Sequence, residues 1–75
     1  MHWDDGFEPK VLARMTAAFD QAWEKLKELG HTTDDESDRN ALACHVVSLV
    51  QLGYTDIAVI ARSASELFRR EKGTQ

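Results

Sequence analysis

Hydrophobic residues recur every three or four positions along three segments of the chain, which is the spacing that places side chains on one face of an α-helix. The first segment follows Pro9, a residue that suits the first turn of a helix, and ends at Gly30, a residue typical of helix ends. Phe7 and Leu12 have the spacing of a hydrophobic staple around the start. The pattern predicts a helix over residues 8–29 with one apolar stripe: Leu12, Met15, Phe19, Ala22, Leu26 and Leu29.

The second segment begins among acidic residues and ends at Gly53. Thr33 and Glu36 have the spacing of a capping box, in which each side chain bonds to the other residue's backbone N–H. The adjacent Val46 and Val47 also suit a strand, but the length, the caps and the period favour a helix over residues 34–52. Its expected apolar positions are Leu42, Val46 and Leu49, flanked by Ala43, Val47 and Val50.

The third segment follows a short link and can be capped by either Thr55 or Asp56. Its basic residues gather near the C-terminal end, where they complement the helix dipole. The pattern predicts a helix over residues 55–72 with this apolar stripe: Ile57, Ile60, Ala61, Ala64, Leu67 and Phe68.

Three such helices predict an all-α fold, a three-helix bundle in which the first helix packs on a hairpin of the second and third. A chain of 75 residues can bury only one core, so we expect residues 1–75 to form a single domain. Residues 1–7 would form an N-terminal arm. Trp3 in this arm either covers the core or anchors a partner, and the sequence leaves both open.

The charges are unevenly distributed along the chain. The net charge of -4 comes from ten acids and four bases in residues 1–38, against three acids and five bases in residues 39–75. The overall sign opposes approach to nucleic acids and anionic membranes, whereas the two halves can attract each other. The N-terminus is acidic where a signal peptide is basic, and no apolar run is long enough to span a membrane. With Cys44 as the single cysteine, these features predict a cytoplasmic protein without membrane contact.

Several of these positions together carry a family resemblance. They are Phe7-Glu8-Pro9, then Met15, Phe19 and Trp23 at helical intervals, then Ala43-x-x-Val46-Val47-x-Leu49 running to Gly53. At these positions, which span most of its length, the chain resembles a group of small uncharacterised helical proteins of bacteria. The group is expected to carry a charged residue after the glycine, where this chain has Tyr54. The resemblance implies a bacterial cytosolic setting and a compact helical fold, and it transfers no active site.

Candidate catalytic residues are confined to the adjacent Cys44 and His45. Neighbours on a helix point about 100° apart, so these two are not expected to act as nucleophile and base. We expect Cys44 to pack as a small apolar side chain and His45 to be partly buried with a local hydrogen bond. Without converging polar groups, the sequence predicts no enzyme and no catalytic residue.

Oxygen-bearing side chains alternate before and into the second helix, at Asp34, Glu36, Asp38 and Asn40. A calcium loop needs glycine at its sixth position and glutamate at its twelfth, and other residues stand there. An acidic helix start explains the same pattern. The histidines and the cysteine also lack the paired short spacings of structural zinc sites, so we expect no metal and no cofactor.

Two functional classes remain. The leading prediction is protein–protein interaction, as a homodimer in its simplest form or with another protein, through apolar residues at the start of the third helix: Tyr54, Ile57, Ala58 and Val59. The alternative is a nucleic-acid-binding regulator, because the second and third helices have the outline of a helix-turn-helix. Its contacts would come from Arg62, Arg69 and Arg70, although glutamates interrupt this basic surface and the net charge disfavours it.

Overall fold

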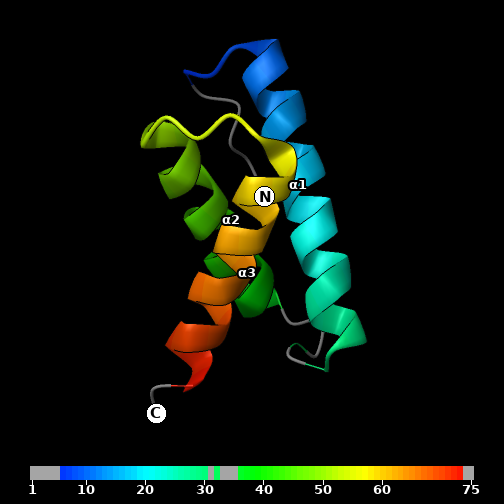
Figure 1. Cartoon of the computed structure of the whole chain (residues 1–75). Coiled ribbons are helices and arrows are strands. Elements are labelled where there is room, and N and C mark those ends of the chain that lie inside the picture. The colour runs from blue at the N-terminus through cyan, green and yellow to red at the C-terminus, as the bar shows by residue number, and fades with distance from the viewer. Residues whose placement is uncertain (1–5, 31, 33–35, 74–75) are drawn as a thin grey trace.

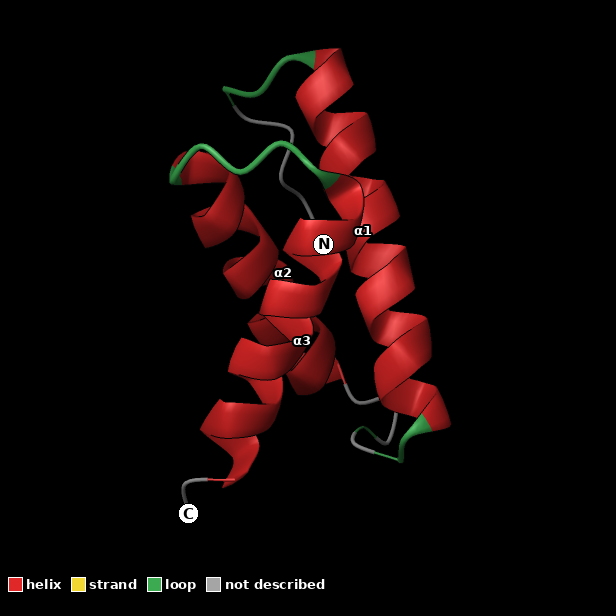
Figure 2. Ribbon diagram, in the orientation of Figure 1, coloured by secondary structure: helices red, strands yellow, loops and turns green. Residues whose placement is uncertain are grey.

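The computed structural model describes residues 6–30, 32 and 36–73, with side chains up to residue 71. In these residues the chain forms three α-helices and no strand (Figure 2). The helices are α1 (Pro9–Glu28), α2 (Glu36–Gln51) and α3 (Ile57–Gly73). The predicted all-α three-helix fold is confirmed, and each helix boundary lies within two residues of its predicted position.

Helix α1 begins and ends one residue inside its predicted bounds. Glu8 is its N-cap in an extended conformation, and Pro9 occupies the first turn. Leu29 is the C-cap, and Gly30 follows with a φ of 74°, a left-handed conformation that glycine adopts without strain. The Gly30 N–H donates to the Lys27 carbonyl over 3.1 Å, which closes the last turn.

The link between α2 and α3 is a hydrogen-bonded reversal of the chain. Gly53 has a φ of 103°, and its N–H donates to the Val50 carbonyl over 3.0 Å. The Tyr54 N–H donates to the Leu49 carbonyl over 3.2 Å. This pair of bonds is a Schellman motif, which satisfies carbonyls that the end of a helix leaves open.

Asp56 caps the start of α3. Its Oδ1 accepts a hydrogen bond from the Val59 N–H over 3.2 Å, and its carbonyl accepts one from the Ile60 N–H over 2.9 Å. Of the two cap candidates in the sequence, the structure therefore selects Asp56 rather than Thr55. The capping box expected from Thr33 falls outside the described residues.

The helices pack so that α1 and α3 run in the same direction and α2 runs against both (Figure 1). All three pairs are in contact, with the most extensive contact between α1 and α3. The long axis of the bundle is 34 Å, which is close to the length of the 20-residue α1.

The core takes side chains from every helix. Its largest fully buried members are Phe68, Met15, Leu26, Leu42, Ile60 and Val46. Phe7 and Leu12, which flank the start of α1, are partly buried and pack against this core. Phe19 and Trp23 stack with ring centroids 5.8 Å apart, and the guanidinium of Arg39 from α2 lies 5.5 Å from the Trp23 ring.

Two packing expectations are wrong. Leu29 was expected in the buried stripe of the first helix, but it is 50% exposed, because as the C-cap it lies beyond the last full turn. Cys44 was expected to pack inside, but it is exposed to solvent. The neighbouring Ala43 takes the buried position instead.

Candidate interaction surfaces

Large apolar side chains are exposed around the link between α2 and α3. Leu52 is 75% exposed, Val59 is 44% exposed and Tyr54 is 40% exposed. We call these three residues the link surface. Of the predicted partner-binding residues, the structure brings Tyr54 and Val59 to this surface, together with Leu52, which the sequence analysis did not select.

The other two predicted partner-binding residues are placed differently. Ile57 is partly buried and packs against the core, so its side chain is largely used inside the domain. Ala58 is exposed but lies at one end of a groove along α3. The apolar residues predicted to bind a partner are therefore divided between the core, the link surface and this groove.

The backbone beneath the link surface is well anchored. The N–H groups of Tyr54 and Val59 both donate hydrogen bonds, the first to the end of α2 and the second to the Asp56 side chain. The Leu52 N–H donates to the Ser48 carbonyl over 3.1 Å. Because each backbone donor is satisfied, the apolar side chains are presented from an ordered turn, which lowers the entropy lost when a partner covers them.

A second surface is an open groove of about 330 Å³ between α1 and α3. It is lined along the first helix by Gln21, Ala22, Lys25, Leu26 and Leu29. Along the third helix it is lined by Ala58, Ala61, Arg62, Ser65, Glu66 and Arg69. We call this surface the α1–α3 groove.

Small side chains form the floor of the α1–α3 groove. Ala22 and Ala61 are almost fully buried, and Leu26 is completely buried beside them. Ser65 is also buried, and its hydroxyl donates to the Ala61 carbonyl over 2.8 Å. The floor is thus apolar, because its one hydroxyl donor is already bonded to the backbone.

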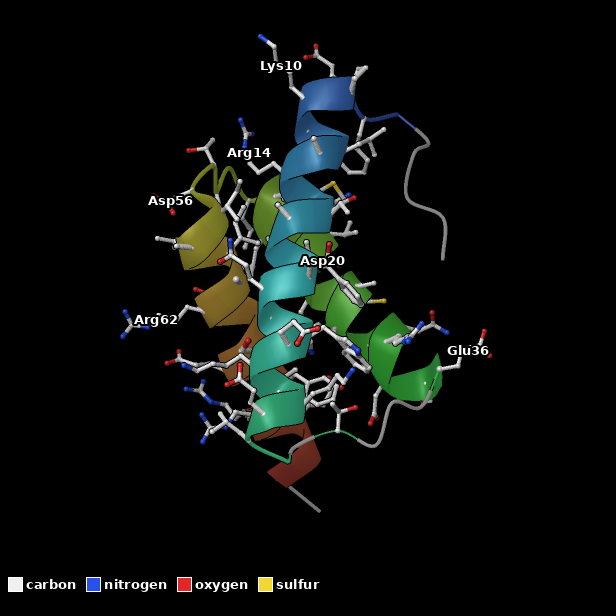
Figure 3. The ribbon with its side chains drawn as sticks, turned by 90° about the vertical axis from the view of Figure 1, so that its right-hand side faces the viewer. Lys10, Arg14, Asp20, Glu36, Asp56 and Arg62 are labelled. Carbon is white, nitrogen blue, oxygen red and sulfur yellow. The ribbon has the colours of Figure 1, made fainter. Side chains whose placement is uncertain are left out.

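The walls of the α1–α3 groove are predominantly basic. Lys25 rises from α1, and Arg62 and Arg69 rise from α3, against the single carboxylate of Glu66. Figure 3 shows Arg62 projecting from α3 into solvent, on the side away from α1. Within the part of the chain that the structure describes, none of these three cations forms an ion pair. A locally positive groove therefore lies on a protein whose net charge is -4.

The groove collects only some of the arginines predicted for nucleic-acid binding. Arg62 and Arg69 line it, whereas Arg70 is exposed on α3 outside its lining. The sequence analysis missed the contribution of α1, with Lys25 and the exposed Leu29. No periodicity within one helix could reveal that these residues face α3.

Among the described residues at the acidic start of α2, Asp38 has a buried carboxylate. Asp38 is 5% exposed, and its Oδ2 accepts a hydrogen bond from the Thr32 hydroxyl over 3.0 Å. Asn40 and Glu36 are exposed, and Asp34 lies outside the described residues. Among the residues with described positions, no three His, Cys, Asp or Glu side chains gather as metal ligands.

Cys44 and His45 point in different directions. Cys44 is exposed, whereas the His45 side chain is 20% exposed and reaches toward α3. The His45 Nε2 lies 3.5 Å from Oε2 of Glu71, which is within ion-pair range. This nitrogen atom is buried and makes no hydrogen bond. The expected partial burial of His45 is confirmed, but Nε2 does not form the expected local hydrogen bond, and the carboxylate within ion-pair range comes from a distant part of the sequence.

Comparison with family models, with curated proteins and with solved structures gives no match for this chain. Across the described helices, none combines the length and the apolar character that crossing a membrane requires. Trp3, for which the sequence left two roles open, lies outside the described residues.

Proposed function

We propose that the protein is a protein–protein interaction module that self-associates through the link surface. The observation that supports this most strongly is the exposure of three large apolar side chains, Leu52, Tyr54 and Val59, within one turn and the helix start that follows it. Apolar side chains concentrated in this way on a small domain mark surfaces that a partner covers. A symmetric dimer would bury the same surface of both copies against each other.

The strength of this association can be worked from the exposures. Complete burial of a large apolar side chain contributes about 1.5–3 kcal/mol, and the three residues are between 40% and 75% exposed. Two copies together therefore gain roughly 5–10 kcal/mol. Association costs about 4–15 kcal/mol in lost freedom of motion, so the net gain is at most about 6 kcal/mol and we expect a weak dimer with a dissociation constant of roughly tens of micromolar or higher.

The test is molar mass in solution by light scattering over a dilution series. The Val59→Glu variant should be monomeric at concentrations where the wild type is dimeric, because burying an unpaired carboxylate is unfavourable. Asn40→Glu is the matched control, since Asn40 is an exposed neutral residue near the start of α2, at the opposite end of that helix from the link, and it should dimerise as the wild type does. A wild type that remains monomeric at the highest concentration would refute self-association.

Nucleic-acid binding through α3 is the second candidate function. It is supported by Arg62 and Arg69, which lie two turns apart on one side of α3. Glu66 stands between them, and the Ser65 hydroxyl is occupied by the backbone. This candidate requires salt-sensitive binding of duplex DNA that Arg62→Gln weakens, and titration at low salt decides it.

We further propose a cytoplasmic setting. Cys44 is a free and exposed thiol, and such a thiol persists in the reduced state where the compartment is reducing. The chain needs no disulfide for its fold, because Cys44 is its only cysteine.

A further inference from the structure

The α1–α3 groove combines an apolar floor with basic walls, and the link surface does not share this combination. Its floor is formed by Ala22, Leu26 and Ala61, and its cations stand on both sides, Lys25 on α1 and Arg62 on α3. A ligand that fits must therefore present apolar groups at its centre and negative charge along its edges.

The dimensions of the groove correspond to a short helix. Its α3 wall runs from Ala58 to Arg69, which at 1.5 Å per residue is about 16 Å, or three helical turns. The exposed Leu29 adds an apolar contact at the far end. A helix laid along such a groove contacts it through residues spaced three or four apart.

We propose that the α1–α3 groove binds an acidic amphipathic helix from a different protein. The apolar stripe of that helix would lie over Ala22 and Ala61. Its acidic borders would face Lys25 on one side and the two arginines of α3 on the other. These cations have no carboxylate partner within the described residues, so binding breaks no ion pair that those residues form.

The charge pattern also discriminates among acidic ligands. Glu66 stands between Arg62 and Arg69 on the α3 wall, so a ligand carboxylate is attracted at both ends of this wall and repelled at its middle. A ligand with a neutral or basic residue opposite Glu66 is favoured over one that is acidic throughout. Glu66 therefore contributes to specificity rather than to affinity.

A second copy of this chain does not provide such a helix from its described part. The apolar stripes of all three helices are buried in the core of their own bundle, and the exposed charges of α1 are three acids and three bases, which do not make an acidic face. A nucleic acid fits less well than a helix, because the floor is apolar and Glu66 would face phosphates.

The experiment uses a designed helical peptide of about 14 residues as the probe, with leucines three or four apart and glutamates on both sides of the leucine stripe. A second peptide has lysine in place of each glutamate, and a third has serine in place of each leucine. Binding is measured by fluorescence anisotropy, and the contacted residues are mapped by chemical-shift changes of backbone amides. The full chain carries Leu52→Gln, which weakens self-association through the link surface without placing a new charge next to Arg62.

Three substitutions separate charge recognition from a general loss of structure. Arg62→Gln should weaken binding of the acidic probe by about twofold to fivefold, as expected for a solvent-exposed ion pair. Glu66→Gln should strengthen it by a similar factor, because it removes a repelling charge. Arg70→Gln is the matched control, a basic residue of the same helix outside the groove, and it should change affinity by less than about twofold.

Binding of the acidic probe with shifts at Gln21 and Arg62, and with opposite effects of Arg62→Gln and Glu66→Gln, is the expected result. The proposal is overturned if this probe does not bind, or if the lysine or the serine peptide binds equally well. It is also overturned if the shifts lie on the link surface, or if short duplex DNA displaces the probe at lower concentration. These outcomes are independent of the dimer proposal, since a monomeric wild type leaves every one of them measurable.

Discussion

The cap of α3 gives the sharpest prediction of stability, because the structure chooses between two residues that the sequence left equivalent. The Asp56 carboxylate accepts the Val59 N–H, whereas Thr55 has no such role in the described structure. Replacing an N-cap side chain by alanine costs about 0.5–2 kcal/mol. The bond here is 3.2 Å long and exposed, so we expect Asp56→Ala to lower the free energy of unfolding by about 1 kcal/mol.

That loss is large enough to measure in a domain of this size. One kcal/mol lowers the melting temperature of a 60–100-residue domain by about 4–8 °C. Circular dichroism during thermal and urea unfolding follows the change, and Thr55→Ala should alter the free energy of unfolding by less than about 0.5 kcal/mol.

Asp56→Asn divides the effect of the cap into its two parts. Asparagine keeps an oxygen acceptor but loses the charge that favours the positive end of the helix dipole, a contribution of about 0.3–1 kcal/mol. We therefore expect Asp56→Asn to lie between the wild type and Asp56→Ala. If Thr55→Ala destabilises as much as Asp56→Ala, the assignment of the cap is wrong.

Three further predictions test the core, the link and the exposed thiol. Phe68 is 1% exposed, so Phe68→Ala should lower the free energy of unfolding by about 3–5 kcal/mol. This is much of the roughly 4–11 kcal/mol expected for a chain of this length, and loss of the helical circular dichroism signal at moderate temperature would report it. Gly53→Ala should lower the free energy of unfolding in urea by about 1–2 kcal/mol, because a φ of 103° strains a residue with a Cβ, although no neighbouring atom obstructs that Cβ. The control is Ser48→Ala on the exposed surface of α2, which should leave the free energy of unfolding unchanged. Cys44 should react with Ellman's reagent in the native protein nearly as fast as in urea, and strong protection would contradict its exposed position.

The sequence was sufficient to predict the three helices, because residues that mark helix ends lie in the sequence next to each apolar pattern. Pro9 and Gly53 mark ends that depend on local backbone chemistry, and the structure places helix ends at both. The errors concern single positions within a correct element. Leu29 continues the apolar spacing of the first helix, but it is the C-cap of α1. The apolar pattern in the sequence therefore includes one residue more than the buried face of the helix.

The α1–α3 groove could not be predicted because it depends on how the helices pack. Lys25 and Arg62 belong to helices separated by the whole of α2, and their proximity follows from the parallel arrangement of α1 and α3. The one signal available was the occurrence of small residues, Ala22 and Ala61, in stripes of larger ones. Such residues allow close approach of two helices, but they do not identify which pair approaches.

The parallel arrangement of α1 and α3 also determines the order in which the molecule can assemble. Helices α2 and α3 are neighbours across the link at residues 52–56, so their contacts close a short loop, whereas Ala22 meets α3 only after a much longer loop has closed. Longer loops lose more chain entropy on closure, and local contacts tend to form first. We therefore expect the α2–α3 hairpin to form ahead of the α1–α2 contact, which closes a similarly short loop but is less extensive, and the contact between α1 and α3 to form last. A ligand bound between α1 and α3 would then slow the separation of α1 from α3, and it would therefore slow the unfolding of the whole domain.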